Sequence, residues 1–437
     1  MSALREKTAA AATHSSPASA SAASGGLSRA SALAPVAVTR LTLTNFRSYA
    51  GLRLDVDPRP VVLTGANGAG KTNLLEALSF LAPGRGLRGV RLAEAGRQTA
   101  AIGTLASPPP PINPWAVAVT LATPDGPLDM GTGLTAATTE RRIVHVNGQP
   151  ARGAAALARH VGVLWLTPAM DRLFLDGPAS RRKFLDRLVT AFDADHARRS
   201  AAYDHAYRQR LRLLRDGGVR PPSSESRALT ARGGEAPWFA ALEDTMARHG
   251  IALAAARHDL VARLNRDLAA ASGPFPGAAL ALVGTVDGWL TEMPAVDAED
   301  AMRRSLWDER RGVIGAGAGP HRSDLGVAMT AVGHPSHGQP AALCSTGEQK
   351  ALLISILLAQ ARLQRAKRGH APLFLLDEVA AHLDQNRRAA LFSEVLRLGA
   401  QAWMTGTDAA LFGDLVESAQ FYAVEAGAVS RRPPPPA

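Results

Sequence analysis

The chain has 437 residues, of which 49 are Lys or Arg and 38 are Asp or Glu, so its formal net charge is +11. This length exceeds what one hydrophobic core usually supports and predicts at least two lobes, while the basic balance favours an anionic macromolecular partner. No apolar run of about 18 residues is present, which argues against a membrane span. A single cysteine, Cys344, excludes an internal disulfide and fits a soluble protein of the reducing cytoplasm.

Both ends of the chain are expected to be disordered. Residues 1–35 are rich in Ala and Ser and lack hydrophobic periodicity, so this arm cannot bury enough apolar surface to fold. Its composition resembles that of a transit peptide, but a bland tail is the preferred interpretation. At the other end, two arginines and a proline run predict a disordered tail over residues 431–437.

A glycine-rich loop follows the apolar strand predicted at residues 61–64 and precedes a helix-like run. Its pattern, G-x-x-x-x-G-K-T, is typical of a P-loop, whose glycines let successive backbone N–H groups point at phosphate oxygens. Lys71 would reach the β- and γ-phosphates of ATP, and the Thr72 hydroxyl would bind Mg²⁺. An ordinary strand-to-helix turn does not explain a lysine and a threonine together at the helix start. The predicted ATP-binding residues are Gly65, Ala66, Asn67, Gly68, Ala69, Gly70, Lys71, Thr72 and Asn73.

The long interval between residues 72 and 344 is predicted to hold a compact helical lobe. Pro and Gly interrupt it at 221–222, 233–234 and 273–276, whereas a long coiled coil needs unbroken heptads. Candidate helices cover residues 178–216 and 238–268. The apolar row of the first helix is interpreted as lobe core and consists of Phe184, Leu185, Leu188 and Phe192.

Basic residues are concentrated in residues 181–220, which carry eleven Arg and Lys against five Asp and Glu. An arginine-rich helical face would neutralise DNA phosphates and give salt-sensitive binding without sequence preference. Since only five of the 49 basic residues are Lys, an overall arginine bias explains part of this surplus. For any single arginine, a solvated helix face remains the alternative to a DNA contact.

A second cluster of candidate site residues lies near the end of the chain. Residues 372–378 read Pro-Leu-Phe-Leu-Leu-Asp-Glu, a buried-strand pattern that ends in two acids and is typical of a Walker B segment. Asp377 would hold Mg²⁺, and Glu378 would polarise the attacking water as general base. A strand ending in Asp-Glu is common by itself. Here S-T-G-E-Q-K precedes it at 345–350, before a helix-like run, and A-H-L-D follows it at 381–384.

The order of these motifs resembles the ATP-binding heads of the SMC and RecF group, and further segments resemble the RecF family itself over nearly the whole chain after residue 36. The Asn147-Gly148 pair in one of these segments is also a hairpin signal. The segments are L-T-L-T-N-F-R-S-Y at 41–49, G-R-G-L-R at 84–88, V-H-V-N-G-Q-P at 144–150, D-G-P-A-S-R-R-K-F-L-D at 176–186 and G-P-H-R-S-D-L at 319–325.

The resemblance implies an α/β fold, an ABC/SMC-type P-loop ATPase head with an inserted, mainly helical lobe. Ser345 and Gly347 would form a signature loop that completes the ATP site of a second subunit, with Arg85 and Asp384 as further candidate ATP contacts. ATP and Mg²⁺ would be the cofactors of a homodimer that closes on double-stranded DNA or on single-strand/double-strand junctions. RecR would be its partner in loading RecA, and the protein would be a slow, DNA-stimulated ATPase of the nucleoid.

We therefore expect a disordered arm at 1–35, an ATPase lobe at 36–170 and 311–430, and a helical lobe at 171–310. Two features depart from related ATPases: residues 403–408 contain no histidine after the strand that follows Walker B, and residues 167–171 contain no clear Q-loop glutamine. Thr407 is the candidate substitute for that histidine. An SMC-like chromosome-organising ATPase is the alternative function, disfavoured by the missing coiled coil. A membrane-transporter ATPase is disfavoured by the large insertion and the basic charge.

Overall fold

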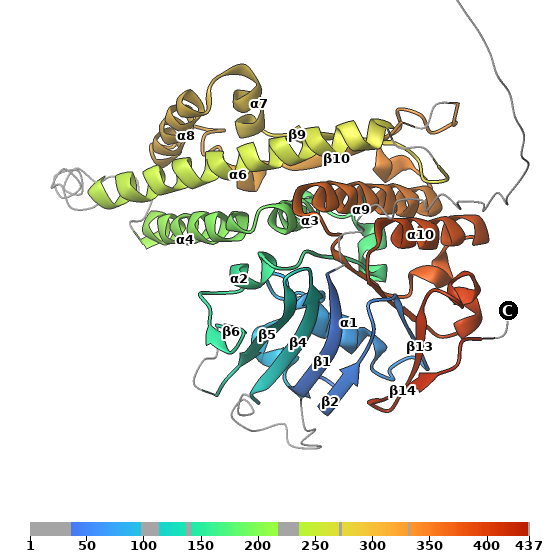
Figure 1. Cartoon of the computed structure of the whole chain (residues 1–437). Helices are drawn as coiled ribbons and strands as arrows, with labels where there is room; N and C mark the ends of the chain where they lie inside the picture. Colours follow the sequence, from blue (N-terminus) through green and yellow to red (C-terminus); the bar gives the residue numbers. More distant parts are fainter. Residues whose placement is uncertain are drawn as a thin grey trace, which may run out of the picture. The chain divides into compact units, whose positions relative to one another are not determined.

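The computed structural model describes residues 36–97, 113–136, 141–216, 236–270, 273–330 and 333–435. All of them belong to one compact unit, Ala34–Ala437, drawn in Figure 1. The predicted disordered arm at 1–35 lies outside the described residues. No helix in the described part of the chain combines the length and the apolar character that crossing a bilayer requires.

The first sheet is antiparallel and has the strand order β2-β1-β4-β5-β6-β7. The family-like segment at residues 41–49 spans the end of its first strand, which stops at Phe46 because Arg47 adopts a left-handed conformation (φ 51°) that turns the chain into the next strand. The predicted turn at Asn147 and Gly148 is confirmed, with φ values of 48° and 74°. The strands are β1 (Ala37–Phe46), β2 (Tyr49–Asp55), β4 (Trp115–Thr123), β5 (Gly126–Leu134), β6 (Ile143–Val146) and β7 (Gln149–Pro150).

The second sheet is mainly parallel, in the order β14-β13-β3-β12-β11-β8, with β14 as an antiparallel edge strand. Residues 431 and 432 belong to β14, so the disordered tail was predicted to begin too early. These two arginines pair with Tyr422 and Phe421 of β13 through backbone hydrogen bonds. Such pairing does not depend on the side chains, and an exposed edge strand can carry charged ones. The strands are β3 (Val61–Thr64), β8 (Val163–Leu166), β11 (Leu373–Leu376), β12 (Ala402–Gly406), β13 (Gln420–Glu425) and β14 (Ala428–Arg432).

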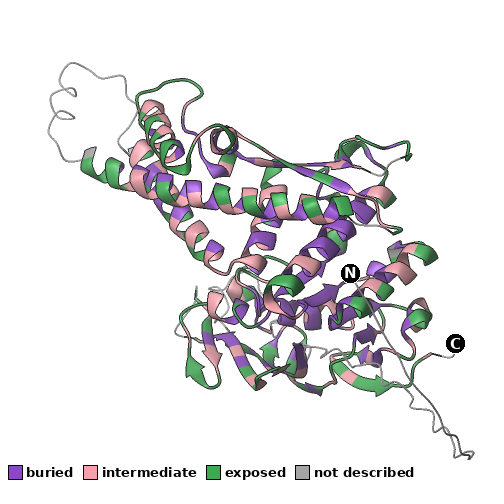
Figure 2. Ribbon diagram, turned by 45° about the horizontal axis from the view of Figure 1, so that its top comes forward, coloured by how far each residue is buried: buried purple, intermediate pink, exposed green. Residues whose placement is uncertain are grey.

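Two hydrophobic cores cover the two faces of the parallel sheet. Alternate residues of β11 separate them: Leu373 and Leu375 join the core that holds helix α1 (Lys71–Ser79) and the antiparallel sheet, whereas Phe374 and Leu376 join the core beneath α9 (Thr346–Arg368). Helix α10 (Gln385–Leu398) packs on that second side as well. Buried residues accordingly line the strands and the inner helix faces in Figure 2.

The described part of the inserted region consists of helices and one strand, and a second strand follows it in the chain. The helix predicted over 178–216 is two helices, because Asp193 leaves the helical conformation (φ −127°) and its carboxylate accepts the N–H of Asp195 at the start of the second helix. The helix predicted over 238–268 is confirmed within α6. The elements are α3 (Pro178–Phe192), α4 (Asp195–Asp216), α6 (Ala236–Ala270), β9 (Ala278–Val283), α7 (Thr285–Glu292), α8 (Ala295–Arg310) and β10 (Asp324–Met329).

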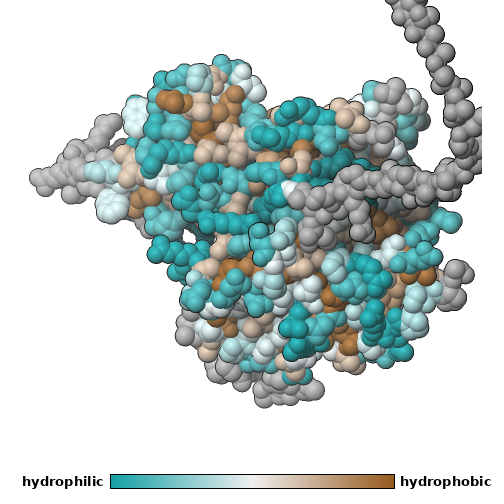
Figure 3. Space-filling model, viewed as in Figure 1, coloured by the Kyte–Doolittle hydropathy of each residue, from teal (hydrophilic) through white to brown (hydrophobic). Residues whose placement is uncertain are grey.

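Packing links the inserted region to the rest of the unit. Strand β9 pairs with β10, which lies beyond the expected boundary at residue 310, and Leu260, Leu264 and Leu268 of α6 share the core of α9. The division into lobes therefore stays a prediction. The surface in Figure 3 is mainly hydrophilic, with apolar patches near α7 and α8. The remaining short elements are α2 (Ala155–Ala158) and the 3-10 turns η1 (Leu92–Ala95), η2 (Pro168–Arg172), η3 (Pro320–Arg322), η4 (Ala341–Leu343), η5 (Val379–His382) and η6 (Ala409–Leu415).

Candidate nucleotide site

The predicted P-loop connects β3 to α1 at the carboxyl edge of the parallel sheet. Gly65 has a φ of 151°, and a Cβ atom there would lie 2.3 Å from the Val424 carbonyl oxygen, so only glycine fits. Lys71 begins α1 and is buried, and its Nζ donates to the carbonyl oxygens of Gly65 (2.7 Å) and Ala66 (3.0 Å). The loop thus holds its lysine inward, where an incoming phosphate would exchange these carbonyl partners for a charged one.

The two predicted Mg²⁺ ligands lie side by side. Thr72 Oγ1 donates to Asp377 Oδ1 at 2.9 Å, although the two residues are 305 positions apart. Asp377 is buried at the end of β11, as a Walker B acid should be. A hydroxyl and a carboxylate offer the oxygen donors that Mg²⁺ prefers, so these residues fit the metal that ATP would bring.

Thr405, at the end of β12, is a site residue that sequence reasoning missed. Its Oγ1 donates to Asp377 Oδ1 (2.8 Å) and accepts the N–H of Glu378 (2.9 Å), so one hydroxyl fixes both Walker B acids. Thr407, the predicted substitute for the absent histidine, is exposed and makes no hydrogen bond with the described residues. Thr405, the last threonine inside the buried strand, is thus the one that contacts the Walker B acids, and the role of Thr407 as a substitute for the histidine stays a prediction.

Glu378, the predicted general base, sits in a strained backbone conformation. Its φ and ψ are 52° and 24°, a left-handed conformation that residues other than glycine adopt only at a cost of about 1–3 kcal/mol. The turn directs the chain from β11 into η5, while its backbone N–H is held by Thr405. Its carboxylate makes no hydrogen bond or ion pair with the described residues, which leaves both oxygens available to a water molecule.

A buried ion cluster at Glu76 fixes the position of α1. Glu76 is fully buried and accepts two hydrogen bonds from Arg47 (2.6 and 2.9 Å) and one from Arg88 (2.6 Å). Arg88 also donates to Asn73 Oδ1 at 2.8 Å, and the amide of Asn73 donates to Ser48 Oγ at 2.9 Å. A buried carboxylate needs such pairing, so this network fixes the helix that carries the P-loop. These contacts explain why the N-F-R-S-Y and G-R-G-L-R segments accompany the P-loop.

Arg85 is not brought to the P-loop. It makes no hydrogen bond or ion pair within the described ranges and instead lines a cavity of about 930 Å³ between the 84–89 loop, β8 and α3. None of the lining residues belongs to the P-loop, to Walker B or to the predicted signature loop. The described contacts of Arg85 therefore give its predicted role as an ATP contact no support, and Arg88 is the arginine of this segment that reaches Asn73, beside the P-loop.

The predicted signature residues cap helices. Ser345 precedes α9, where its Oγ accepts the N–H of Glu348 (3.3 Å), while the Glu348 carboxylate accepts the N–H of Ser345 (2.6 Å) and the hydroxyl of Ser336 (2.8 Å). These hydrogen bonds lower the pKa of Glu348 to about 2. Gly347 is exposed, and Asp384 caps α10 through the N–H of Arg387 (2.9 Å).

The predicted site residues therefore form two separate sets. Arg387 bridges Asp384 to the signature loop by donating to the Gly347 carbonyl oxygen at 3.4 Å. No hydrogen bond or ion pair in the described part of the chain joins Ser345, Gly347 or Asp384 to the P-loop or to the Walker B acids. Buried Lys350 on α9 donates to Asp171 at 3.1 Å, which ties the signature helix to the segment that follows β8.

Comparison with known proteins gives consistent matches. A family model described as RecF/RecN/SMC N terminal domain matches residues 37–428. The DNA replication and repair protein RecF of Mesorhizobium japonicum is 46% identical over 398 residues, which are 90% of this chain and 97% of that protein. RecF of Rhizobium rhizogenes is 46% identical over 402 residues, 91% of this chain and 99% of that protein. A solved structure of the recombination mediator protein RecF-ATPrS in the RecFOR pathway has a TM-score of 0.73 at 19% identity, covers 92% of this chain and 99% of its own, and supports the fold.

Proposed function

This chain belongs to the RecF family of DNA replication and repair proteins, and from this premise we propose that it is an ATP-dependent DNA-binding switch of recombinational repair. The predicted fold, an ABC/SMC-type P-loop ATPase head, is confirmed by the family match and the structural likeness. In the proposed cycle, two subunits close around two ATP molecules and clamp double-stranded or gapped DNA. Hydrolysis then reopens the clamp.

One observation carries the ATP part of this proposal: the hydrogen-bonded set of Thr72, Asp377 and Thr405 beside the inward-held Lys71. ATP would place its β- and γ-phosphates at Lys71 and the P-loop amides, and Mg²⁺ would bind between Thr72 and Asp377. Mg²⁺ would neutralise phosphate charge, while Glu378 accepts a proton from the attacking water. Turnover would be slow and DNA-stimulated, so the protein acts as a switch rather than a processing enzyme.

The shared ATP site rests on the signature residues. Ser345 and Gly347 lie at the amino end of the long helix α9, where the helix dipole and free N–H groups favour a γ-phosphate. These residues are exposed and have no contact with the P-loop of their own chain. We therefore assign them to the γ-phosphate bound by a second copy of the chain.

DNA binding is supported by charge, although fewer arginines are available than the count suggests. Arg210 is buried between Glu243 and Glu309, and Arg181 pairs with Asp324, so these side chains stabilise the fold. The exposed arginines of α4 remain as candidate phosphate contacts and are Arg198, Arg208, Arg212 and Arg215. RecR as partner in RecA loading and a nucleoid location in the cytoplasm complete the proposal. An SMC-like chromosome organiser remains the alternative.

Glu378→Gln tests this proposal because it keeps the side-chain shape but removes the base. We expect ATP binding to persist, hydrolysis to fall about a hundredfold, and a closed dimer to stay on gapped duplex DNA. Light scattering coupled to size-exclusion chromatography, with and without RecR, measures the closed complex. Normal hydrolysis by this variant would exclude Glu378 as the base. Absence of any ATP-dependent retention on DNA would contradict the clamp.

A further inference from the structure

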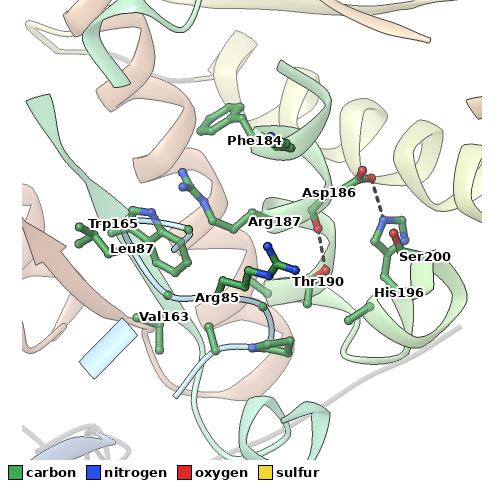
Figure 4. A pocket seen from close by; sticks show the side chains of 18 of the residues that line it. Arg85, Leu87, Val163, Trp165, Phe184, Asp186, Arg187, Thr190, His196 and Ser200 are labelled. Atoms are coloured by element: carbon green, nitrogen blue, oxygen red, sulfur yellow. Dashed lines mark hydrogen bonds and ion pairs between the residues drawn. The ribbon is translucent and has the colours of Figure 1, made fainter. Parts of the chain in front are cut away.

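The cavity of about 930 Å³ beside Arg85 has no role in the proposed ATP cycle. It lies between the loop at residues 84–89, strand β8 and the helices α3 and α4. Figure 4 shows Arg85 and Arg187 extending into this space from opposite sides, one from the loop and one from α3. The volume lies within the range of about 300–1,000 Å³ that is typical of small-ligand pockets.

Arg187 is a half-buried cation without an anionic partner among the described residues. Its guanidinium lies over the Trp165 ring, 4.4 Å from the centroid, and 5.3 Å from that of Phe184. Its Nε is shielded from solvent and has no hydrogen-bond partner in the described part of the chain, where the side chain's one hydrogen bond runs from Nη2 to the Met170 sulfur at 3.5 Å. Burial lowers the pKa of Arg187 to about 9. Such a group is costly to keep unless something else supplies the missing charge.

Arg142 shows how this chain satisfies a buried arginine that has only a structural task. It also lies against an aromatic ring, that of Phe80 at 5.2 Å, and burial lowers its pKa to about 10. Unlike Arg187, it donates to two carbonyl oxygens, those of Phe80 (2.6 Å) and Ala82 (3.0 Å). The described residues give Arg187 no oxygen acceptor of this kind, so its position is not explained by packing alone.

On the opposite wall of the cavity, the conformation of the 84–89 loop fixes the position of Arg85. Gly84 and Gly86 adopt φ values of 102° and 70°, and the N–H of Leu87 donates to Ser79 Oγ at 2.7 Å, which fixes the loop. Arg88 forms an ion pair with Glu76, whereas Arg85 has no partner among the described residues. The loop therefore presents one free guanidinium to the cavity.

The remaining charges of the wall favour an anion. Lys183 and Arg208 add two cations that no described carboxylate pairs, against the unpaired acids Asp176 and Asp204. Asp186 also faces this space, but Arg257 binds it with two hydrogen bonds of 2.8 Å. With Arg85 and Arg187 the unpaired balance is positive, and Ser200 provides a hydroxyl nearby, whereas the Thr190 hydroxyl donates to the Asp186 carbonyl oxygen at 2.7 Å (Figure 4).

We propose that Arg187 and Arg85 form a second anion site, separate from the P-loop, that binds the terminal phosphate of a nucleotide-sized ligand. Guanidinium groups suit phosphate because they donate paired N–H bonds, and the phosphate would replace the hydration that Arg187 has lost. The volume of about 930 Å³ is of the size that holds a free nucleotide or a strand end. The site does not depend on the proposed clamp.

Calorimetric titration of the full-length protein tests the site with two matched pairs of probes. Thymidine 5′-monophosphate against thymidine reports a free nucleotide, and 5′-phosphorylated against 5′-hydroxyl pentathymidylate reports a strand end. If the ligand is a free nucleotide, we expect the phosphorylated probe of the first pair to bind at least about tenfold more tightly than its partner; if it is a strand end, we expect this of the second pair. The reason is that the probe without phosphate lacks a charge-assisted hydrogen bond. Equal binding within both pairs, or no binding of any probe, would overturn the proposal.

Variants separate this site from packing and from the P-loop. Arg187→Met and Arg85→Met should each weaken the phosphorylated probe about tenfold or more, whereas Arg304→Met, at an exposed arginine of α8, should not. Arg187→Met should also melt no lower than wild type without ligand, because an unpaired charge is replaced by an apolar chain of similar size. Lys71→Ala should bind the phosphorylated probe as tightly as wild type does. Loss of the probe in Lys71→Ala, or unchanged binding in Arg187→Met, would contradict the assignment.

Discussion

The two halves of the proposed ATP site are built in different ways. In the P-loop half, residues from three strand ends are tied together by hydrogen bonds, and both Lys71 and Asp377 are buried. In the signature half, Ser345 is exposed and Asp384 leaves 56% of its side chain accessible. Each of these two residues satisfies the N–H groups of its own helix.

This difference indicates where preorganisation is needed. Groups that bind ATP within one chain are held in place before the ligand arrives, which lowers the cost of ordering them. Groups that would meet the ATP of a second copy are held only by helix capping, so they stay satisfied while the partner is absent. The comparison therefore predicts large effects on nucleotide binding in the first half and effects on association in the second.

Lys71→Ala should give the largest effect, because it removes the one lysine that the P-loop holds inward. We expect the affinity for ATP to fall about a hundredfold or more, since a charge-assisted contact with phosphate is lost in a buried place. Titration calorimetry with Mg-ATP measures this change. Lys367→Ala, on the far end of α9, is the matched control and should bind ATP normally. An affinity of Lys71→Ala within about a factor of two of wild type would break the comparison at its strongest point.

Thr405→Val should have an intermediate effect because it removes the hydroxyl that holds both Walker B acids. Loss of a hydrogen bond to a charged group costs about 1.5–3 kcal/mol, so we expect hydrolysis to fall about tenfold or more while ATP still binds. A steady-state ATPase assay with DNA present measures the rate. Thr407→Val is the control and should hydrolyse ATP nearly as wild type does. If Thr407→Val were the slower variant, Thr407 and not Thr405 would be the threonine on which hydrolysis depends.

Glu348→Gln should have the smallest effect, and that effect should depend on pH. The pKa of Glu348 is lowered from 4.5 to about 2 in the folded chain, so its carboxylate contributes stability above pH 4.5 that is lost as the pH falls toward 2. The difference in urea midpoint between wild type and Glu348→Gln should therefore be present at pH 6 and should shrink at pH 3. Glu417→Gln, at an exposed glutamate, should show no such trend. A difference that grows in acid would rule out this role of the capping box.

Local pattern was sufficient for the parts of the site that lie in continuous segments. The P-loop and the Walker B acids follow from strand, turn and helix-start patterns within a few residues, whereas the caps at Ser345 and Asp384 were found only in the structure. Thr405 and Glu76 were missed, because their partners lie 28 and 29 residues away, at Asp377 and Arg47, and only the fold brings them together. The place of Arg85 beside the cavity was not foreseen, because it lies in a loop whose glycines have positive φ values that the sequence does not reveal.

The same limit applies to charge. The count of arginines in residues 181–220 indicates a basic region, but Arg210 and Arg181 form ion pairs with acids from distant helices and strands and are not free to bind DNA. Arg187 differs from both, because its surroundings supply aromatic rings and a sulfur atom instead of a carboxylate. Composition therefore indicates the kind of partner, whereas only the structure shows which arginines are free to meet it.

A mixing experiment tests the shared site most directly. Ser345→Arg should bind ATP as a monomer but fail to dimerise and hydrolyse, because a bulky cation would block closure onto the partner's γ-phosphate. Lys71→Ala should fail because it cannot bind ATP, although its own signature loop is intact. Together they would form a heterodimer with both defects at one composite site and one intact site, so an equal mixture should recover about a quarter of the wild-type ATPase activity if subunits pair at random. Activity no higher than that of the separate variants, or ATP-dependent dimerisation of Ser345→Arg alone, would contradict the shared site.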